Sequence, residues 1–380
     1  MQRRAFVQAA TAASTLGLGA TIGGWPSASR AESRVVRFGQ SASLSGGQAG
    51  YGHDMRVGIA AAFAAASAQE SRTGLRFELI AKDDGGLRAN CMKNVLTLAD
   101  SDVLGLVGLT SGVGAEASLP VFEDTRLPLL GTASGNLGLR AAGVKNVFNV
   151  RVGHDAEYRR MIGYAKDFGL QRVGIVYMGD AAASNLNALK QALADANMAP
   201  KVSVAIDRNA TNFEAAAREL LQNRPDCVMF TTNAEPICKI VDQMSAAKYP
   251  GLYYASSYSG QALIDKLAAR QQSCVMSVVV PRPSSMSTLV VAQAQRDLPL
   301  VQKDAKLGVT TLEGYIVGRI AVEAAYAAQA SGRLSRARFG EVLAGLKADL
   351  GGFRVDFGGG SQGSRFVDLI ALDRYGRLVG

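Results

Sequence analysis

The sequence predicts an α/β protein with two lobes, each a doubly wound parallel sheet covered by helices on both faces, joined by a hinge that the chain crosses several times. Three observations support this prediction. Short β-branched runs alternate with longer, Ala-rich amphipathic segments, which is a βαβ rhythm. The rhythm occurs in two successive series, which indicates two sheets. The last part of the chain has helices without strands between them, and such helices are expected to return and cover the first sheet.

The first series supplies the first sheet. Its strands are the apolar, β-branched runs at residues 35–39, 75–81, 103–108 and 127–130. Between them lie segments with apolar residues at helical spacing, at residues 52–69, 88–100 and 113–124. Because a helix separates each strand from the next, neighbouring strands are expected to run parallel.

The second series begins after a strand at residues 147–151. Its helices are expected at residues 155–168, 185–197, 212–223, 235–247 and 260–269. Its strands are expected at residues 172–177, 201–206, 226–231, 252–255 and 274–280. The second sheet should therefore also be parallel, with helices on both faces.

The pattern changes after Pro281-Arg282-Pro283. Three helices are expected, at residues 289–298, 311–330 and 335–346, followed by an antiparallel hairpin of residues 353–357 and 366–372 around a turn of three glycines. The predicted division is a first lobe of residues 32–152 plus 282–350, and a second lobe with the hinge of residues 153–281 plus 351–380. A hinge with several crossings also implies a cleft between the lobes.

Residues 1–31 have the features of an export signal. Arg3-Arg4 precede Phe6-Val7, an uncharged stretch occupies residues 9–24, and Ser29-Arg30-Ala31 offers a cleavage site with small residues. The paired arginines resemble those of twin-arginine signal peptides. An N-terminal membrane anchor is the alternative, but the stretch is shorter than the ~20 apolar residues that span a bilayer. We therefore expect cleavage near Ala31 and release into a bacterial periplasm.

Composition argues against several classes of protein. The formal charge of +9 falls to +6 without Arg3, Arg4 and Arg30, and the remaining basic residues are scattered among acidic ones, so we expect no nucleic-acid partner. No further stretch is apolar enough for a membrane helix. The cysteines are Cys91, Cys227, Cys238 and Cys274, and they form no CxxC pair, so no metal site is expected. Buried free thiols are favoured over a disulfide. No cofactor is expected either.

Three loops that follow strands of the first series carry hydroxyls and glycines. In parallel sheets, ligands bind beyond the carboxyl ends of the strands, where helix N-termini offer free N–H groups to an anion. Such loops could bind a carboxylate without an arginine. The alternative is that each is an ordinary N-cap or turn. The candidate residues in these loops are Ser45, Thr110, Ser111, Thr132, Ala133 and Ser134.

Over nearly the whole chain after residue 32, the sequence resembles the periplasmic solute-binding proteins of the leucine/isoleucine/valine-binding type, which feed ABC importers and have the type I periplasmic binding fold. The order and spacing of short motifs carry this resemblance: Leu44-Ser45-Gly46, Tyr51-Gly52, Asp83-Asp84, Leu119-Pro120-Val121-Phe122, Pro128-Leu129-Leu130-Gly131, Val147-Phe148-Asn149-Val150-Arg151, Leu312-Glu313-Gly314-Tyr315, Leu350-Gly351-Gly352 and residues 362–368. The resemblance implies no enzymatic activity, permease subunits of an ABC transporter as partners, and a monomer.

The resemblance also implies a site. Ser111 and Ser134 fall where the family holds a ligand carboxylate, with Thr110 and Thr132 beside them. In the second lobe, the family's aromatic residues are replaced by Ala182 and Ala234, and a Glu that holds an amino group is replaced by Ser256. An α-amino acid is therefore disfavoured as ligand, and a bulkier or aromatic carboxylate is favoured, with Tyr258 as a possible replacement wall.

Enzymatic functions agree less well with the sequence than a solute-binding role does. Residues 112–117 match the dinucleotide pattern GxGxxA, but the acidic residue that should hold the ribose is missing. The sequence has no GxSxG elbow between a strand and a helix, which argues against a hydrolase of that type. His154 is expected to cap a helix or lie at the surface. Asp83-Asp84 is expected to form a solvated turn. The remaining alternative is a subunit that presents its ligand to a membrane sensor, which the sequence cannot distinguish from an importer component.

Overall fold

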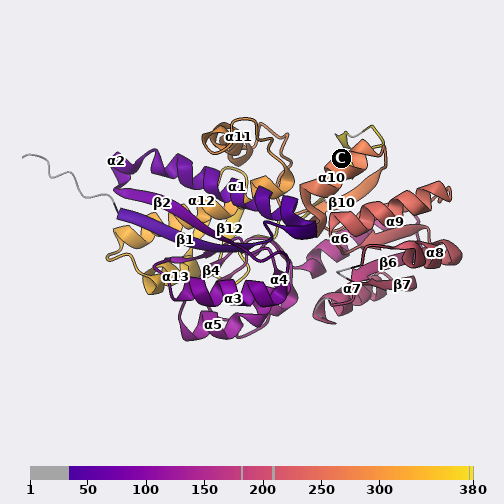
Figure 1. The fold of residues 1–380 in the computed structure, drawn as a ribbon, viewed down its shortest axis with the longest axis horizontal. Helices are drawn as coiled ribbons and strands as arrows, with labels where there is room; N and C mark the ends of the chain where they lie inside the picture. Colours follow the sequence, from indigo (N-terminus) through magenta and orange to yellow (C-terminus); the bar gives the residue numbers. More distant parts are fainter. Residues whose placement is uncertain (1–33, 181–182, 208–209, 376, 380) are drawn as a thin grey trace, which may run out of the picture. The chain divides into compact units, whose positions relative to one another are not determined.

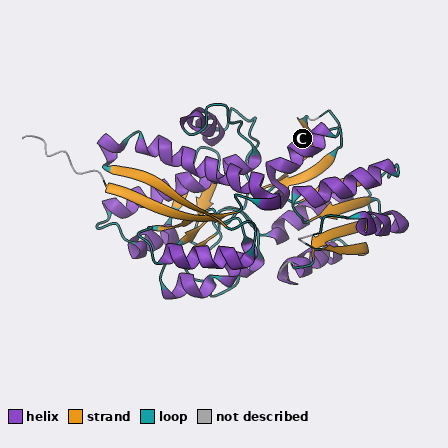
Figure 2. Cartoon of the chain, in the orientation of Figure 1, coloured by secondary structure: helices purple, strands orange, loops and turns teal. Residues whose placement is uncertain are grey.

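The computed structural model describes residues 34–180, 183–207, 210–375 and 377–379. The predicted signal peptide lies outside these residues. Within residues 33–380, which form one compact unit, the strands gather into two main sheets with helices on both sides (Figures 1 and 2). The predicted α/β architecture of two parallel-sheet lobes is confirmed.

The sheet of the first lobe is entirely parallel, with the strand order β2-β1-β3-β4-β5. Its strands are β1 (Arg34–Ala42), β2 (Leu75–Asp83), β3 (Gly105–Val107), β4 (Leu129–Leu130) and β5 (Val147–Phe148). The helices that connect them are α1 (Ala49–Ser67), α2 (Glu70–Thr73), α3 (Arg88–Ala99), α4 (Gly112–Ala117) and α5 (Leu119–Asp124).

Three helices near the C-terminus complete this lobe: α11 (Leu289–Asp297), α12 (Val309–Ala330) and α13 (Arg336–Gly345). Successive strand residues point to opposite faces of the sheet, so Leu129 packs with α3, α4 and α5, whereas Leu130 packs with the cluster that contains α1 and α12. Figure 1 shows α1 and α3 on opposite sides of this sheet. The cluster that α1 shares with α12 is thus where the C-terminal helices were expected to pack.

The sheet of the second lobe has the order β14-β13-β10-β9-β8-β6-β7. Its parallel strands are β6 (Val173–Met178), β7 (Pro200–Ile206), β8 (Cys227–Phe230), β9 (Leu252–Ala255) and β10 (Cys274–Val278). Its helices are α6 (His154–Asp167), α7 (Ala183–Asp195), α8 (Glu214–Asn223), α9 (Ala234–Ala246) and α10 (Gly260–Ala269). From β7 to β10 the strand order repeats that of the first lobe, so each lobe has the same topological switch point: β1/β3 in the first and β6/β8 in the second.

The predicted C-terminal hairpin was wrong. β12 (Arg354–Asp356) pairs with β11 (Lys347–Asp349), whereas β13 (Asp368–Leu372) pairs antiparallel with β10 in the other lobe and with β14 (Leu378–Val379). The ring of Phe357, just beyond β12, lies 5.5 Å from the ring of Phe148, so this hairpin packs against the first lobe. The predicted lobe boundary at residue 351 therefore differs from this packing, because the chain returns to the second lobe only after the glycine turn.

The predicted helix at residues 113–124 is also interrupted. Ser118 ends α4, and α5 begins at Leu119 with Pro120 in its first turn. Proline has no N–H to donate and disfavours helical geometry in the residue before it, so it tolerates the start of a helix better than its interior.

Two crossing segments of the hinge lie side by side. The amide of Asn149 donates to Ser361 O at 2.7 Å, and the amide of Gly363 donates back to Asn149 O at 2.8 Å. The Gln362 side chain adds a hydrogen bond to Arg151 O at 2.8 Å. A third crossing joins β10 to α11.

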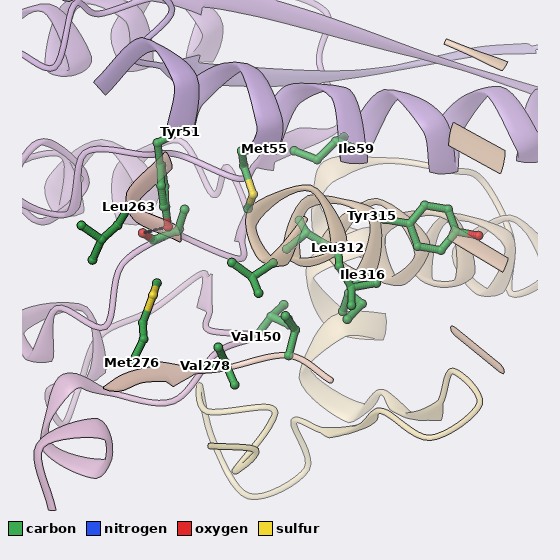
Figure 3. Close-up of a cluster of buried hydrophobic side chains, with 14 of the residues drawn as sticks. Tyr51, Met55, Ile59, Val150, Leu263, Met276, Val278, Leu312, Tyr315 and Ile316 are labelled. Carbon is green, nitrogen blue, oxygen red and sulfur yellow. Dashed lines mark hydrogen bonds between the residues drawn. The ribbon is translucent and has the colours of Figure 1, made fainter. Parts of the chain in front are cut away.

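Apolar side chains of both lobes meet next to the hinge (Figure 3). Tyr51 and Met55 of α1 lie above Leu263 of α10 and Met276 of β10, with Val150 of the crossing segment nearby. This continuous cluster couples the lobes through packing as well as through the chain. In the part of the chain that the structure describes, no helix combines the length and hydropathy needed to cross a bilayer. All four cysteines are free and buried, as predicted.

Candidate functional site

A cavity lies between the carboxyl ends of the two sheets and is lined by both lobes. The centre of a water molecule can occupy about 60 Å³ of the space inside this cavity. The cavity therefore suits a small molecule. The first lobe contributes residues of the loops after β1, β2, β3 and β4, and the second lobe contributes α6, β6, α7 and the loops after β8 and β9. The cavity therefore touches both topological switch points, where open parallel sheets bind their ligands.

The wall from the first lobe is polar. Ser111 is the N-cap of α4, and its Oγ accepts the amide of Gly114 at 3.1 Å. Ser134 Oγ accepts the amide of Asn136 at 3.2 Å. Both hydroxyls keep their hydrogen for a further acceptor, and the first amides of a helix have no partner within it. This wall can therefore donate several hydrogen bonds to an anionic group.

The loops of this wall hold one another in place. The side-chain amide of Asn136 donates to Gly112 O at 3.1 Å, which ties the loop after β4 to the start of α4. A Cβ at Gly112 would lie 2.3 Å from Ser134 Oγ, so only glycine allows the two loops to approach so closely. The two serine hydroxyls are therefore brought together by the local sequence.

The wall from the second lobe combines apolar and polar side chains. Met178, Leu186 and Leu189 line it together with the ring of Tyr158. Thr231, which follows β8, and Tyr177 add hydroxyl groups. Among the described residues that line the cavity, none is Asp, Glu, Lys or Arg. The cavity thus offers hydrogen-bonding groups on both sides, apolar surface chiefly on the second, and no carboxylate from the described lining residues to pair with an ammonium group.

A buried ionic network supports the second wall. Arg151 contacts Glu157 at 3.1 Å and Glu313 at 3.4 Å, and all three side chains are buried. Despite the opposing effect of burial, the charge of Arg151 lowers the pKa of Glu157, whereas burial raises the pKa of Glu313. The network joins the crossing segment, α6 and α12, and so fixes the position of α6.

His154 belongs to this network and lines the cavity. Its Nδ1 lies 3.3 Å from Glu157 Oε1, and its ring stacks on Tyr158 at 5.7 Å. Burial lowers the pKa of His154, so the ring is neutral near pH 7. The expected capping or surface role is corrected: His154 is buried because the chain crosses between lobes directly before it.

Hydrogen bonds bridge the lobes on two sides of the cavity. The amide of Leu137 donates to Asn185 Oδ1 at 3.1 Å, and the side-chain amide of Gln48 donates to Tyr258 Oη at 2.9 Å. Leu137 and Gln48 belong to the first lobe, Asn185 and Tyr258 to the second. These contacts form only while the lobes are close together.

Three of the predicted site residues line this cavity: Ser111, Ser134 and Tyr258. Ala182 lies outside the described residues, and the remaining six do not line this cavity. Thr110 accepts the amide of Ser43, Thr132 donates to Ser134 O, and Ala133 O accepts from Tyr51, so these residues brace the wall from behind. Ala234 lines a second opening beside Tyr258, and Ser256 is buried with its hydroxyl unpaired.

Ser45 is exposed and caps a turn. Its side chain and nearby amides donate hydrogen bonds to Asp83 and lower the pKa of Asp83 to about 2. Asp84 is buried against Ser41 and Ser43, so the expected solvated turn is only half correct. Among the described residues, no group of three or more His, Cys, Asp or Glu side chains could hold a metal ion.

The sequence reasoning missed most of the second wall. The rule applied to the first lobe, that ligands lie beyond strand ends, would also have selected Tyr177, Met178 and Thr231. By contrast, Leu186 and Leu189 of α7 face the cavity at helical spacing that is equally typical of ordinary core residues.

Comparisons with known proteins agree with this arrangement. A family model for periplasmic binding proteins matches residues 35–367. A possible leucine/isoleucine/valine-binding protein from Rhodopirellula baltica SH 1 is 27% identical, with a TM-score of 0.83 over 93% of this chain and 98% of that chain. No curated protein matches the sequence significantly.

Two further solved structures share the fold. One is a solute-binding protein of an ABC transporter from R. palustris in complex with benzoate, which is 15% identical with a TM-score of 0.78 over 91% of this chain and 95% of that chain. The other is a branched chain amino acid ABC transporter from Thermus thermophilus with bound valine, which is 15% identical with a TM-score of 0.80 over 91% of this chain and 95% of that chain.

Proposed function

The chain belongs to the periplasmic binding protein family, and we propose that it captures a small carboxylate-bearing solute between its lobes and delivers it to an ABC importer. The observation that carries this proposal is the cavity at the two switch points, which has hydroxyl and amide donors on one wall and apolar side chains on the other. Binding sites for small molecules commonly combine apolar walls with a few polar groups that fix orientation.

The chemistry of the cavity favours an aromatic or branched acid over an α-amino acid. Solved structures with this fold include one with benzoate and one with valine. No acidic side chain occurs among the described lining residues, so an ammonium group would be buried without a partner. A carboxylate attached to an apolar body can accept hydrogen bonds from the hydroxyl and amide donors and pack against the apolar side chains.

Export and assembly complete the proposal. We propose that residues 1–31 direct the chain through a twin-arginine pathway and are removed near Ala31. The permease subunits of the importer are the proposed partners, and the protein acts as a monomer. N-terminal sequencing of the protein recovered from the periplasm tests the cleavage site, and light scattering tests the monomer.

A binding screen tests the proposed ligand class. Benzoate, phenylacetate, 4-methylpentanoate, benzamide and benzylamine differ in the charge they carry on a similar apolar body. A bound acid at a hundred times its Kd stabilises the protein by about 2.7 kcal/mol, which a thermal-shift assay detects. We expect acids to raise Tm and benzylamine to leave it unchanged. Stabilisation by benzylamine with none by any acid would overturn the proposal.

A further inference from the structure

The Nδ1 edge of His154 is enclosed by protein. The amide of His154 donates to Gly135 O at 2.8 Å, and a Cβ placed on Gly135 would lie 2.6 Å from His154 Nδ1. On the same edge, Nδ1 faces Glu157 Oε1 at 3.3 Å. A ligand in the cavity therefore meets His154 at another part of the ring.

Glu157 is held as a carboxylate that can only accept hydrogen bonds. Its Oε1 also faces Arg151 at 3.1 Å, while Oε2 accepts the amide of Ser257 at 3.0 Å and the hydroxyl of Ser277 at 2.7 Å. The side chain is fully buried. Because an ionised carboxylate has no hydrogen to give, the hydrogen shared with His154 belongs to Nδ1.

The Nε2 atom is the free end of the ring. In the described part of the chain, no hydrogen bond to Nε2 is found. The atom is not fully buried, so it retains accessible surface. His154 as a whole is nearly buried and lines the cavity, and because its Nδ1 edge is enclosed, the opposite edge with Nε2 is the part of the ring left to face the cavity. A neutral ring with its hydrogen on Nδ1 presents a lone pair there.

We propose that His154 selects the solute: its Nε2 lone pair accepts a hydrogen bond from a hydroxyl or amide N–H group, so that the ligand is a hydroxy- or amido-substituted carboxylate. This inference rests on the proposed function for the carboxylate, while the state of the ring stands independently of it. A site built to accept a hydrogen bond discriminates strongly against an analogue without the donor, because its own polar group is then left unpaired.

The state of the ring can be measured without any ligand. The chain has two histidines, and His53 is exposed, so a His53→Gln variant leaves a single imidazole. Nitrogen NMR of the ¹⁵N-labelled variant near pH 7 should show a protonated Nδ1 and an unprotonated Nε2. A hydrogen on Nε2, or on both nitrogens, would overturn the inference.

Matched pairs of acids test the selection. Benzoate is compared with the three hydroxybenzoates, and 4-methylpentanoate with 2-hydroxy-4-methylpentanoate, by calorimetry. At least one hydroxy acid should bind tenfold or more tightly than its parent. His154→Phe keeps a ring against Tyr158 but removes the acceptor, and should abolish this preference, whereas His154→Gln keeps an acceptor and should retain part of it.

The outcomes separate the two proposals. Binding of parent acids with no gain from any hydroxyl, or a gain that survives in His154→Phe, would overturn the role of His154 and leave the carboxylate site intact. Failure of every acid to bind would overturn the proposed function, and with it the selection of substituted acids. The NMR result would then decide the state of the ring by itself.

Discussion

Ser111 and Ser134 have a role in the fold and, under the proposed function, a second role in binding. Each Oγ accepts a backbone N–H from its own loop, which is an ordinary capping or turn role. Each also lines the cavity, where its hydrogen can be donated to a ligand. The two interpretations of these loops, as caps or as ligand-binding groups, are therefore compatible.

Replacing both serines should weaken binding. Each hydroxyl that donates to an ionised group contributes roughly 1.5 to 3 kcal/mol, so Ser111→Ala with Ser134→Ala should lose about tenfold to a hundredfold in affinity per residue. Loss of the Ser111 cap should also lower stability by ~1 kcal/mol. Ser118→Ala is the control, because Ser118 is a buried serine at the end of the same helix, outside the cavity. Calorimetry that finds unchanged affinity in the double variant would place the carboxylate elsewhere.

A single functional group distinguishes leucine from 4-methylpentanoate. The two share a carbon skeleton, and leucine adds an ammonium group for which the described lining residues offer no carboxylate. Burial of such a charge costs several kcal/mol, so leucine should bind more than a hundredfold more weakly than 4-methylpentanoate. Competition calorimetry measures the ratio. Submicromolar binding of leucine would show that a carboxylate reaches the ligand after all.

At the scale of elements, two glycines allow α1 and α12 to pack closely. A Cβ at Gly58 would lie 2.0 Å from Thr311 O, and one at Gly314 would lie 2.2 Å from Met55 O. Neither backbone atom can move without shifting its helix. The Leu312-Glu313-Gly314-Tyr315 motif is therefore explained in part by packing, which positions Glu313 beside Arg151.

Gly314→Ala should destabilise the protein. Overpacking of a close contact costs about 1–3 kcal/mol, and here the clash is with backbone. Gly163→Ala in α6 is the matched control, because a Cβ there meets no atom within 4 Å and should add about 0.5–1 kcal/mol of helix stability. Urea unfolding of both variants gives the comparison. A Gly314→Ala variant that is at least as stable as the unmodified protein would contradict this view of the α1–α12 contact.

Asp54 on α1 should make stability depend on pH. Burial and the charge of Asp265 on α10 raise the pKa of Asp54 to about 6. A raised pKa means that the folded state holds the proton more tightly, so stability falls as pH rises from about 4 to about 6. Asp54→Asn should remove this fall and, allowing for solvent screening, stabilise the protein by roughly 1–2 kcal/mol at pH 7. The gain should vanish at pH 4, and its persistence there would exclude ionisation as the cause.

The sequence predicted most helices and strands but not every pairing between strands. Runs such as residues 252–255 and 260–269 correspond to β9 and α10 because their periodicity reflects burial on the sheet. The pairing of residues 354–356 with 347–349 could not be predicted, because the strand at 368–372 follows 354–356 along the chain and was the expected partner. In the structure the chain crosses between lobes after residues 354–356, so the strand at 368–372 lies in the other lobe. In the site, Ser111 and Ser134 followed from a rule about strand ends, whereas the burial of His154 depends on its contacts with Glu157 and Tyr158, which the predicted crossing before residue 153 did not indicate.

At the scale of the molecule, the repeated strand order determines where the cavity lies. Each lobe has its own switch point, and the cavity takes its lining from both. The wall with the serine hydroxyls belongs to one lobe and most of the apolar side chains to the other, so neither lobe alone offers a complete site. We therefore expect the lobes to close as the ligand is captured.

Binding should therefore compact the protein. A ligand that touches both walls stabilises the state in which the lobes are close, so small-angle scattering should show a smaller radius of gyration with the tightest-binding acid than without it. The bridges Leu137–Asn185 and Gln48–Tyr258 exist only in that state. Loss of each costs about 0.5–1.5 kcal/mol, so Asn185→Ala with Gln48→Ala should weaken affinity by roughly tenfold. Gln191→Ala, on the exposed side of the same helix as Asn185, is the control and should change nothing. Identical scattering curves for free and saturated protein would refute closure, and they would mean that the lobes already hold their bound arrangement before the ligand arrives.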